Sequence, residues 1–411
     1  MQLKISAPAD IHTKIQLPAS KSLSNRALLI QALSEVYMPL HNISDCDDTK
    51  IMQNGLVNRN ETINIQAAGT AMRFLTAFYA IQPDTVKILT GSARMMQRPI
   101  KILVDALRQL GADIEYLGKE GFPPLKIKGK RLNGGELHLP ANVSSQYISA
   151  LMMIAPKLKG GLILHLEDAI LSRPYIDMTL DIMKDFGGMA GWTDVDTLSV
   201  EEKSYLGCEY TIENDWSAAS YWYETASLIP DATLELPGLK AKSTQGDSSI
   251  VKLFRQLGIK TSFTHNGAYL TQRFKKLKRL SYDFSNEPDL AQTFVVTCCL
   301  LNIPFRFSGL SSLKIKETNR IYALINELGK LGYQLAEEDE GVLAWYGKQH
   351  EVEGCPAINT YEDHRMAMSL APACIRCGQI IINDAEVVSK SYPHFWDEMR
   401  KAGFTVREIK K

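Results

Sequence analysis

Two kinds of hydrophobic pattern alternate along the chain, and each recurs six times. The first begins with small or polar residues and continues as a helix-length run that is apolar on nearly every side. A helix without a polar face is typical of a protein interior. Runs of this kind occupy residues 20–33, 68–81, 144–155, 215–229, 288–301 and 362–375.

The second pattern is amphipathic, starts with a capping residue or proline, and stops at or near a glycine, as helices do. From the second apolar run onward, the starts of the apolar runs lie about 70 to 76 residues apart, which indicates an internal repeat. Short alternating or β-branched stretches, such as 137–140, 161–166 and 378–383, predict strands. The amphipathic runs occupy residues 47–56, 98–112, 172–188, 246–259, 316–333 and 391–404.

Six repeats in 411 residues divide naturally into three plus three, because a chain of this length exceeds one ordinary core. We therefore expect an α/β (α+β) fold of two similar domains, each with three repeats around buried central helices. One domain is predicted over residues 19–213. The other combines 1–18 with 214–411, since the strand-like first residues are expected to pair back into it. An active site is expected in the cleft between the domains.

The composition excludes several classes of protein. Lysine plus arginine (46) equals aspartate plus glutamate (46), so no nucleic-acid partner is expected and any positive site must be local. No stretch approaches 18 uninterrupted apolar residues, and the N-terminus predicts a strand rather than a signal peptide. The seven scattered cysteines favour reduced thiols. We expect a cytoplasmic monomer that contacts no membrane.

Cations gather near the starts of the predicted helices. A helix N-terminus carries partial positive charge, so a cation there lowers stability unless an anion compensates. Taken singly, each could be a solvated helix start: Ser20 or Ser22 could simply cap its helix, and Glu317 and Arg320 could form a surface ion pair. Their recurrence at equivalent places favours an anion site. The cations are Lys21, Arg26, Arg98, Lys316, Arg320, Arg365 and, just ahead of the last helix, Lys390.

Two carboxylates, Asp289 and Glu317, stand among these cations. Each could neutralise charge or transfer protons, and general acid–base chemistry needs one donor and one acceptor. The chain has no dinucleotide-binding glycine pattern after a strand, no Walker sequence and no HExxH zinc motif. Cys374 and Cys377 lack a second pair for zinc, and Asp45–Asp48 lacks EF-hand spacing. No metal and no organic cofactor are expected.

Eleven stretches, in order, resemble the 5-enolpyruvylshikimate-3-phosphate (EPSP) synthase family along essentially the whole chain. They are LPASKSLSNRALL, AGTAMRFL, GSARMMQRPI with VDALRQLGA, SSQYISALMM, SRPYIDMTL, STQGDSS, EPDLAQT, KIKETNR, YEDHRMAMSL and SKSYP. The resemblance implies two domains of three repeats, the enolpyruvyl transferase inside-out barrel. It also implies transfer of the enolpyruvyl group of phosphoenolpyruvate to the 5-hydroxyl of shikimate 3-phosphate, a step of aromatic amino-acid and chorismate biosynthesis, without a cofactor.

The resemblance also implies a role for individual residues. Asp289 would accept the proton of the 5-hydroxyl, while Glu317, with Lys21 or His364, would protonate the methylene carbon. Ser22 and Arg26 would hold the shikimate carboxylate. The other residues implied for shikimate 3-phosphate are Lys21, Ser144, Ser145, Gln146, Ser172, Tyr175, Asp289, Ser312 and Lys316. Those implied for phosphoenolpyruvate are Lys21, Gly69, Thr70, Arg98, Gln146, Arg320, His364, Arg365 and Lys390.

The chain departs from the family pattern at a few places. Gln66-Ala67 replaces the usual Gly-Asn before the Ala-Gly-Thr stretch, so an amide expected near phosphoenolpyruvate is missing. Ser312, Asn319 and Gln97 replace the usual Asn, Asp and Glu. None of these departures removes an implied proton carrier, but they bear on affinity and inhibitor response.

Two alternative functions remain at this point. A sister enolpyruvyl transferase acts on UDP-N-acetylglucosamine and carries a reactive cysteine in the loop equivalent to residues 91–100, where this chain has none. The other alternative is a catalytically silent relative that binds shikimate 3-phosphate, which Ala67 and Ser312 motivate. Asp289 and Glu317 argue against a silent protein.

Overall fold

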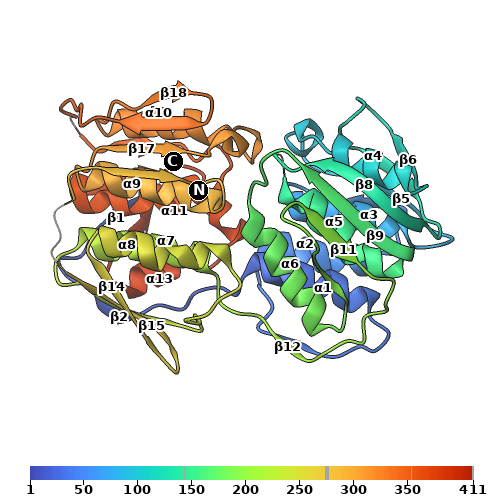
Figure 1. The fold of residues 1–411 in the computed structure, drawn as a ribbon. Coiled ribbons are helices and arrows are strands. Elements are labelled where there is room, and N and C mark those ends of the chain that lie inside the picture. Colours follow the sequence, from blue (N-terminus) through green and yellow to red (C-terminus); the bar gives the residue numbers. More distant parts are fainter. Residues whose placement is uncertain (143, 274–276, 353, 410–411) are drawn as a thin grey trace. The chain divides into compact units, whose positions relative to one another are not determined.

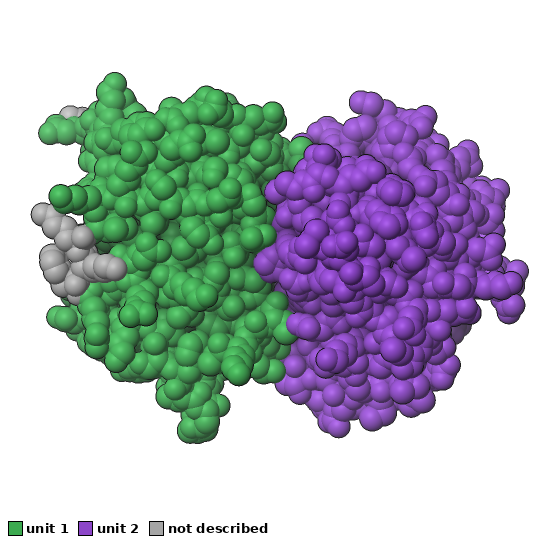
Figure 2. All heavy atoms as spheres, viewed as in Figure 1, with its two compact units in different colours: residues 1–18, 213–411 green, residues 19–212 purple. Residues whose placement is uncertain are grey.

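The computed structural model describes residues 1–142, 144–273, 277–352 and 354–409. The chain splits into two compact units: unit 1 comprises residues 1–18 and 213–411, and unit 2 comprises 19–212 (Figure 2). Each unit has its own hydrophobic core. No helix in the described ranges is long and apolar enough to cross a membrane.

Unit 2 contains six α-helices within its described part, and their bounds follow the two sequence patterns. Its helices are α1 (Lys21–Leu33), α2 (Asp47–Val57), α3 (Gly69–Ala80), α4 (Lys101–Gln109), α5 (Ser145–Ile154) and α6 (Arg173–Asp185). Its strands are β3 (Leu40–His41), β4 (Thr62–Asn64), β5 (Val86–Thr90), β6 (Asp113–Tyr116), β7 (Leu125–Lys128), β8 (Asn133–Pro140), β9 (Lys159–Glu167), β10 (Ala190–Trp192), β11 (Thr197–Val200) and β12 (Tyr210–Thr211).

Unit 1 is built in the same manner from both ends of the chain. Its helices are α7 (Trp216–Leu228), α8 (Ile250–Gln256), α9 (Ala291–Leu300), α10 (Arg320–Lys330), α11 (His364–Leu370), α12 (Cys374–Cys377) and α13 (Phe395–Lys401). Its strands are β1 (Leu3–Ser6), β2 (His12–Lys14), β13 (Thr233–Pro237), β14 (Ile259–Thr264), β15 (Gly267–Gln272), β16 (Leu280–Asp283), β17 (Phe305–Ser308), β18 (Ala336–Asp339), β19 (Val342–Trp345), β20 (Ala357–Ile358), β21 (Gln379–Ile382) and β22 (Thr405–Glu408).

Five four-stranded sheets share one topology in the described chain: a parallel pair followed by two antiparallel neighbours. Examples are β4-β5-β7-β6 in unit 2 and β16-β17-β19-β18 in unit 1. A buried helix connects each of these two parallel pairs, α3 in the first and α9 in the second, as a parallel crossover requires. The other sheets have the orders β10-β11-β9-β8, β14-β15-β13-β2, β20-β21-β1-β22 and the two-stranded β12-β3.

Near the points where the chain passes from one unit to the other, strands far apart in sequence pair within their own unit. In unit 1, β2 pairs in parallel with β13, although more than 200 residues separate them in sequence. In unit 2, β3 pairs in parallel with β12 in the same manner. Strand β1 lies between β21 and β22, with Leu3 and Ile5 almost fully buried. Glu213, predicted at the end of the first domain, belongs to unit 1, where it accepts hydrogen bonds from Trp216 and Ser243.

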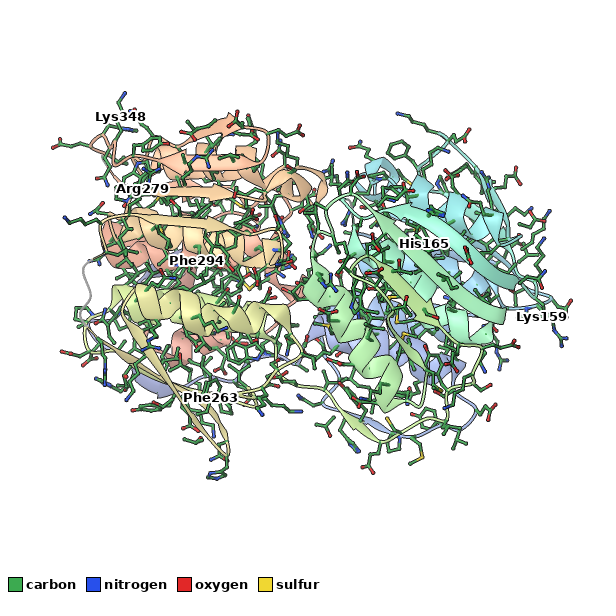
Figure 3. All side chains as sticks on the ribbon, viewed as in Figure 1. Lys159, His165, Phe263, Arg279, Phe294 and Lys348 are labelled. Atoms are coloured by element: carbon green, nitrogen blue, oxygen red, sulfur yellow. The ribbon has the colours of Figure 1, made fainter. Side chains whose placement is uncertain are left out.

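The apolar runs form the interior of each unit. Helices α7, α9 and α11 run through the middle of unit 1 (Figure 1), and every residue of α9 is buried. Figure 3 shows Phe294 of α9 among the interior side chains of this unit. The sixth run is not one helix: α11 ends at Leu370 and a 3₁₀ turn follows, because Pro372 interrupts the hydrogen-bond ladder. The predicted interior position of the apolar runs is therefore confirmed for these three helices.

Candidate active site

The start of α1 holds a buried guanidinium in unit 2. Ser20 is the N-cap, and its Oγ accepts a hydrogen bond from the backbone of Leu23 at 3.4 Å. One turn later Arg26 is only 2% exposed. Its Nε donates to Thr179 Oγ1 at 2.7 Å and its Nη2 to Ser149 Oγ at 3.1 Å. Ser20 therefore caps the helix, as predicted, and Arg26 in the same helix is an interior residue.

All the acceptors of Arg26 in the described chain are uncharged: these two hydroxyls and the carbonyl oxygens of Ser22 and Tyr175. Burial lowers the pKa of Arg26 to about 10, because the charged guanidinium is less stable away from water. A buried charge is normally paired. The environment of Arg26 is therefore suited to an anionic group of a ligand.

Lys21, the first residue of α1, is paired with an acid of the next helix. Its Nζ lies 3.0 Å from Asp48 Oδ2, and the Asp48 side chain is 5% exposed. Asp48 stands in the first turn of α2, where a carboxylate is favoured by the helix dipole. The ion pair fixes the ammonium group beside the first turn of α1.

The first turn of α3 meets Arg98. An ideal Cβ on Gly69 would lie 2.5 Å from Arg98 Nη1, so the absence of a side chain allows the guanidinium to rest against the helix start. Gln146, in the first turn of α5, donates from Nε2 to Thr70 Oγ1 at 3.2 Å. The structure therefore brings together four predicted residues, Gly69, Thr70, Arg98 and Gln146.

Arg73 holds this arrangement in place, and sequence reasoning missed it. It is buried on α3, and its Nη1 donates to the carbonyl oxygen of Gly69 at 3.1 Å. Its Nη2 donates to the carbonyl oxygen of Pro99 at 2.9 Å. The same carbonyl oxygen also accepts a hydrogen bond from Tyr147 Oη at 2.5 Å. Arg73 thus connects the start of α3 to the segment that carries Arg98. An arginine inside an apolar helical run was the signal available in the sequence.

The predicted phosphate-binding serines lie at the starts of α5 and α6. Ser144 is the N-cap of α5, and its Oγ accepts from the backbone of Gln146 at 3.3 Å; Ser145 is buried. Ser172 precedes α6 with φ +56°, a left-handed conformation that a serine adopts only at a cost in free energy. Tyr175 is on the first turn of α6, and its backbone carbonyl oxygen accepts a hydrogen bond from Arg26. These side chains present hydroxyls where helix N–H groups are also available.

In unit 1, Arg320 joins three carboxylates. Its Nε donates to Asp363 Oδ2 at 2.7 Å, its Nη2 lies 3.0 Å from Glu317 Oε2, and its Nη1 lies 3.2 Å from Asp289 Oδ1. Burial alone would lower the pKa of Arg320, but Asp363, Glu317 and Asp289 together raise it above its usual value. Both predicted proton carriers are therefore held by one guanidinium.

The other predicted cations of unit 1 surround the same acids. Arg365 Nη2 lies 2.9 Å from Asp289 Oδ2, and Arg365 Nη1 donates to Tyr221 Oη at 3.3 Å. Lys316 Nζ lies 3.8 Å from Asp289 Oδ1. Lys390 Nζ lies 3.5 Å from Glu317 Oε1. His364 is buried beside them, with its Nδ1 3.8 Å from Asp363 Oδ1.

Asp363 and Asp247 are two further acids of this group that sequence reasoning did not single out. Asp363 is the N-cap of α11 and accepts from the backbone of Arg365 at 2.9 Å. Asp247 is buried in the 3₁₀ turn Gly246–Ser249 and accepts a hydrogen bond from Ser217 Oγ. Burial and the neighbouring Asp289 raise the pKa of Asp247 to about 7, although Arg365 acts in the opposite direction. No local sequence pattern distinguishes these two acids from ordinary caps.

Comparison with known proteins decides the family. The model of the EPSP synthase (3-phosphoshikimate 1-carboxyvinyltransferase) family matches residues 53–399. A protein of Bacteroides fragilis (strain YCH46), named 3-phosphoshikimate 1-carboxyvinyltransferase, is 55% identical over 407 residues, 99% of each chain. One of the same name from Sulfurovum sp. (strain NBC37-1) is 34% identical over 94% of this chain and 96% of its own.

The chain belongs to the EPSP synthase family. Solved structures agree on the fold: an EPSP synthase from Acinetobacter baumannii has a TM-score of 0.79 and 21% identity over 99% of this chain and all of its own. The enolpyruvyl transferase NikO from Streptomyces tendae has a TM-score of 0.77 and 14% identity over 99% of this chain and 98% of its own. The predicted fold class, the two-domain inside-out arrangement of EPSP synthases, is confirmed. The sister transferase and the silent relative are not favoured by these comparisons.

Three departures from the usual EPSP synthase pattern lie in turns or at the start of a helix. Gln66 has φ +50°, and its carbonyl oxygen accepts from the backbone of Ser92 at 2.9 Å, so this segment is a fixed turn before α3. Ser312 lies in the 3₁₀ turn Ser311–Ile315, four residues before Lys316. Asn319 is the N-cap of α10, and its Oδ1 accepts from the backbone of Tyr322 at 3.2 Å. Asn319 therefore performs the capping role that an aspartate would perform.

Proposed function

We propose that this protein is a 3-phosphoshikimate 1-carboxyvinyltransferase that transfers the enolpyruvyl group of phosphoenolpyruvate to the 5-hydroxyl of shikimate 3-phosphate and releases phosphate. The name of the 55% identical relative supports this activity. The observation that carries the proposal is Arg26, a buried guanidinium whose acceptors in the described chain are all neutral, which suits the shikimate carboxylate.

We assign the remaining contacts of shikimate 3-phosphate to groups near the helix starts. Ser22 joins Arg26 at the carboxylate, and Tyr175 and Gln146 line the ring. Hydroxyls and N–H groups at a helix start favour phosphate, and a lysine adds a point charge. The phosphate contacts are Ser144, Ser145, Ser172 and Lys316, with Lys21, Asp289 and Ser312 completing the substrate set.

Phosphoenolpyruvate carries a carboxylate and a phosphate, which planar guanidinium groups bind in a bidentate manner. In unit 2, Arg98 lies against Gly69 with Thr70 and Gln146 beside it, which supports an anion site there. The groups of unit 1 carry the proton-transfer residues among their cations. We propose that residues of both sets bind phosphoenolpyruvate. The phosphoenolpyruvate set is Lys21, Gly69, Thr70, Arg98, Gln146, Arg320, His364, Arg365 and Lys390.

The chemistry requires one proton acceptor and one proton donor. Asp289 takes the proton of the 5-hydroxyl, and the cationic side chains of Lys316, Arg320 and Arg365 lie within 3.8 Å of its carboxylate. Glu317, with Lys21 or His364, protonates the methylene carbon, so that C2 becomes electrophilic and the hydroxyl oxygen adds to it. The tetrahedral intermediate then loses phosphate and a proton from the new methyl group, which restores the double bond. Orientation and preorganised charge account for the rate.

A phosphate-release assay tests this function. The enzyme is expected to release phosphate with shikimate 3-phosphate plus phosphoenolpyruvate, and not with UDP-N-acetylglucosamine plus phosphoenolpyruvate. No release with the shikimate substrate at high enzyme concentration would contradict the proposal. Tight binding of shikimate 3-phosphate without turnover would identify a silent relative.

We also propose that the protein is a cytoplasmic monomer. The seven cysteines are all free thiols in the structure, as expected for a reducing compartment. Light scattering coupled to size-exclusion chromatography is expected to give a mass near 45.9 kDa, and twice that mass would contradict the monomer.

A further inference from the structure

A second basic site lies in unit 1, at the C-terminal end of α8. A cavity of about 460 Å³ opens there, within the size range of small-molecule sites. None of its lining residues belongs to the groups assigned above to shikimate 3-phosphate or phosphoenolpyruvate. The lining residues are Val251, Arg255, Gly258, Ile259, Lys260, Thr261 and Arg273.

Among the described residues that line this cavity, three are cations and none is an acid. Arg255 is in the last turn of α8, Lys260 is on β14, and Arg273 follows the last residue of β15. Lys260 lies opposite Thr271 in the β14–β15 pairing, and Arg273 is two residues beyond Thr271, so both cations belong to one face of the hairpin. Across the part of the chain that the structure describes, these three side chains make no hydrogen bond or ion pair.

A purely structural explanation covers only one of the three. Arg255 near a helix C-terminus interacts favourably with the helix dipole. Lys260 and Arg273 are on the hairpin and gain nothing from that dipole. Like charges around one hollow repel each other, and the absence of a carboxylate in the lining leaves the repulsion uncompensated within the cavity. An anion in the cavity would compensate it.

The walls indicate what else the ligand carries. Val251 is partly exposed and supplies apolar surface, whereas Ile259 is only 1% exposed and belongs to the core beside the cavity. Thr261 supplies a hydroxyl whose position is held by a 2.9 Å hydrogen bond to Tyr223 Oη. Apolar walls with a few fixed polar groups are typical of sites for organic molecules rather than for bare ions. We propose that this cavity binds a small organic phosphate, a molecule with at least two negative charges and an uncharged ring or chain, such as a nucleotide.

ATP is the probe for this proposal, and the methyl groups of Val251 and Ile259 are the reporters. In methyl-labelled protein at 0.15 M salt, ATP is expected to shift these two resonances saturably. The reporters are local, so binding of ATP phosphates to the proposed active site does not affect the result. The readout needs no turnover, so it remains informative even if the transferase activity were absent.

The matched variants are Arg255→Gln/Arg273→Gln and Lys252→Gln/Lys278→Gln. Each removes two exposed cations, but Lys252 and Lys278 do not line the cavity. The first variant is expected to bind ATP at least 10-fold more weakly and the second to bind like the wild type, with both keeping wild-type phosphate release. The proposal is overturned if the methyl resonances do not shift, or if both variants weaken binding equally, which would indicate only general attraction to positive charge.

Discussion

Arg320 and Asp363 form a two-point ion pair in the interior of unit 1. Nε donates to Oδ2 at 2.7 Å and Nη2 to Oδ1 at 3.3 Å, and the Asp363 side chain is fully buried. The same Oδ1 caps α11 by accepting from the backbone of Arg365. One carboxylate therefore orients both arginines that hold Asp289.

Asp363→Asn is expected to lower the free energy of unfolding by about 3 kcal/mol, because removal of one partner leaves Arg320 less compensated in the interior. The amide oxygen can still cap α11, so Asp363→Ala is expected to cost about 1 kcal/mol more. Urea denaturation of both variants measures these values. Equal stability of Asp363→Asn and the wild type would show that Glu317 and Asp289 suffice for Arg320.

Arg26→Met separates binding from stability. Its guanidinium has only neutral acceptors, so an apolar side chain of similar length is expected to change the free energy of unfolding by less than about 1.5 kcal/mol. Binding of shikimate 3-phosphate, measured by calorimetry, is expected to weaken about 100-fold, since a charge-assisted hydrogen bond is lost. The exposed Arg131→Met is the control. Unchanged binding in Arg26→Met would remove the assigned carboxylate contact.

Asp289→Ala is expected to reduce turnover about 1,000-fold, in the range of general base catalysis, while shikimate 3-phosphate binding changes only a few-fold. Phosphate release and calorimetry on the same preparation give the two values. Should binding fall as far as the rate, Asp289 would be a ligand contact and not the proton acceptor.

Gly69→Ala tests the packing of Arg98 against α3. The added Cβ would meet Arg98 Nη1 at 2.5 Å, and the flexible end of the arginine can move away, so stability is expected to change little. The displaced guanidinium is expected to raise KM for phosphoenolpyruvate about 10-fold, with a smaller effect on KM for shikimate 3-phosphate. Steady-state kinetics with each substrate varied in turn gives both constants, and equal effects on both would contradict the assignment.

Asp247 makes stability depend on pH. Its pKa is raised to about 7, so the folded protein binds one more proton than the unfolded chain between about pH 4 and pH 7. The free energy of unfolding should therefore fall as pH rises through this window, by roughly 1.4 kcal/mol per pH unit, and level off above it.

Asp247→Asn cannot ionise, so its stability relative to the wild type is expected to increase from about pH 4.5 to pH 7.5. Thermal unfolding across this range measures the difference. The exposed Asp10→Asn serves as the control and should follow the wild type. Parallel curves for the wild type and Asp247→Asn would mean that Asp247 is ionised in the folded protein throughout.

Much of the fold follows from local pattern. The apolar run 288–301 becomes the 3₁₀ turn Pro288–Leu290 and α9, buried on all sides as its composition predicts. At the start of α1, Ser20 is the cap, as predicted, and Arg26 is buried; the binding role of this stretch stays a prediction.

The premise that no carboxylate compensates the predicted cations is met for Arg26 but not for Lys21, which pairs with Asp48. For Arg26, no compensating carboxylate is among its described partners. Arg320, Arg365 and Lys390, in contrast, are compensated by Asp289, Glu317 and Asp363 of their own unit. These pairings join residues up to 76 positions apart, and local periodicity carries no information on such distances. The role of Arg73 was missed for the same reason. Its hydrogen bond to the carbonyl oxygen of Pro99 joins residues 26 positions apart, which the local pattern does not predict.

The position of β1 has a consequence for the order in which the chain folds during synthesis. Residues 19–212 form unit 2 and are complete once the ribosome has passed Ile212. Strand β1 is made first, but both of its partners, β21 and β22, are made nearly 400 residues later. The side chains of Leu3 and Ile5 therefore have no strand partners until β21 and β22 have been synthesised, at a rate of about 5–20 residues per second. A chaperone that binds short apolar segments would find residues 3–6 available for most of the time that the chain is being made.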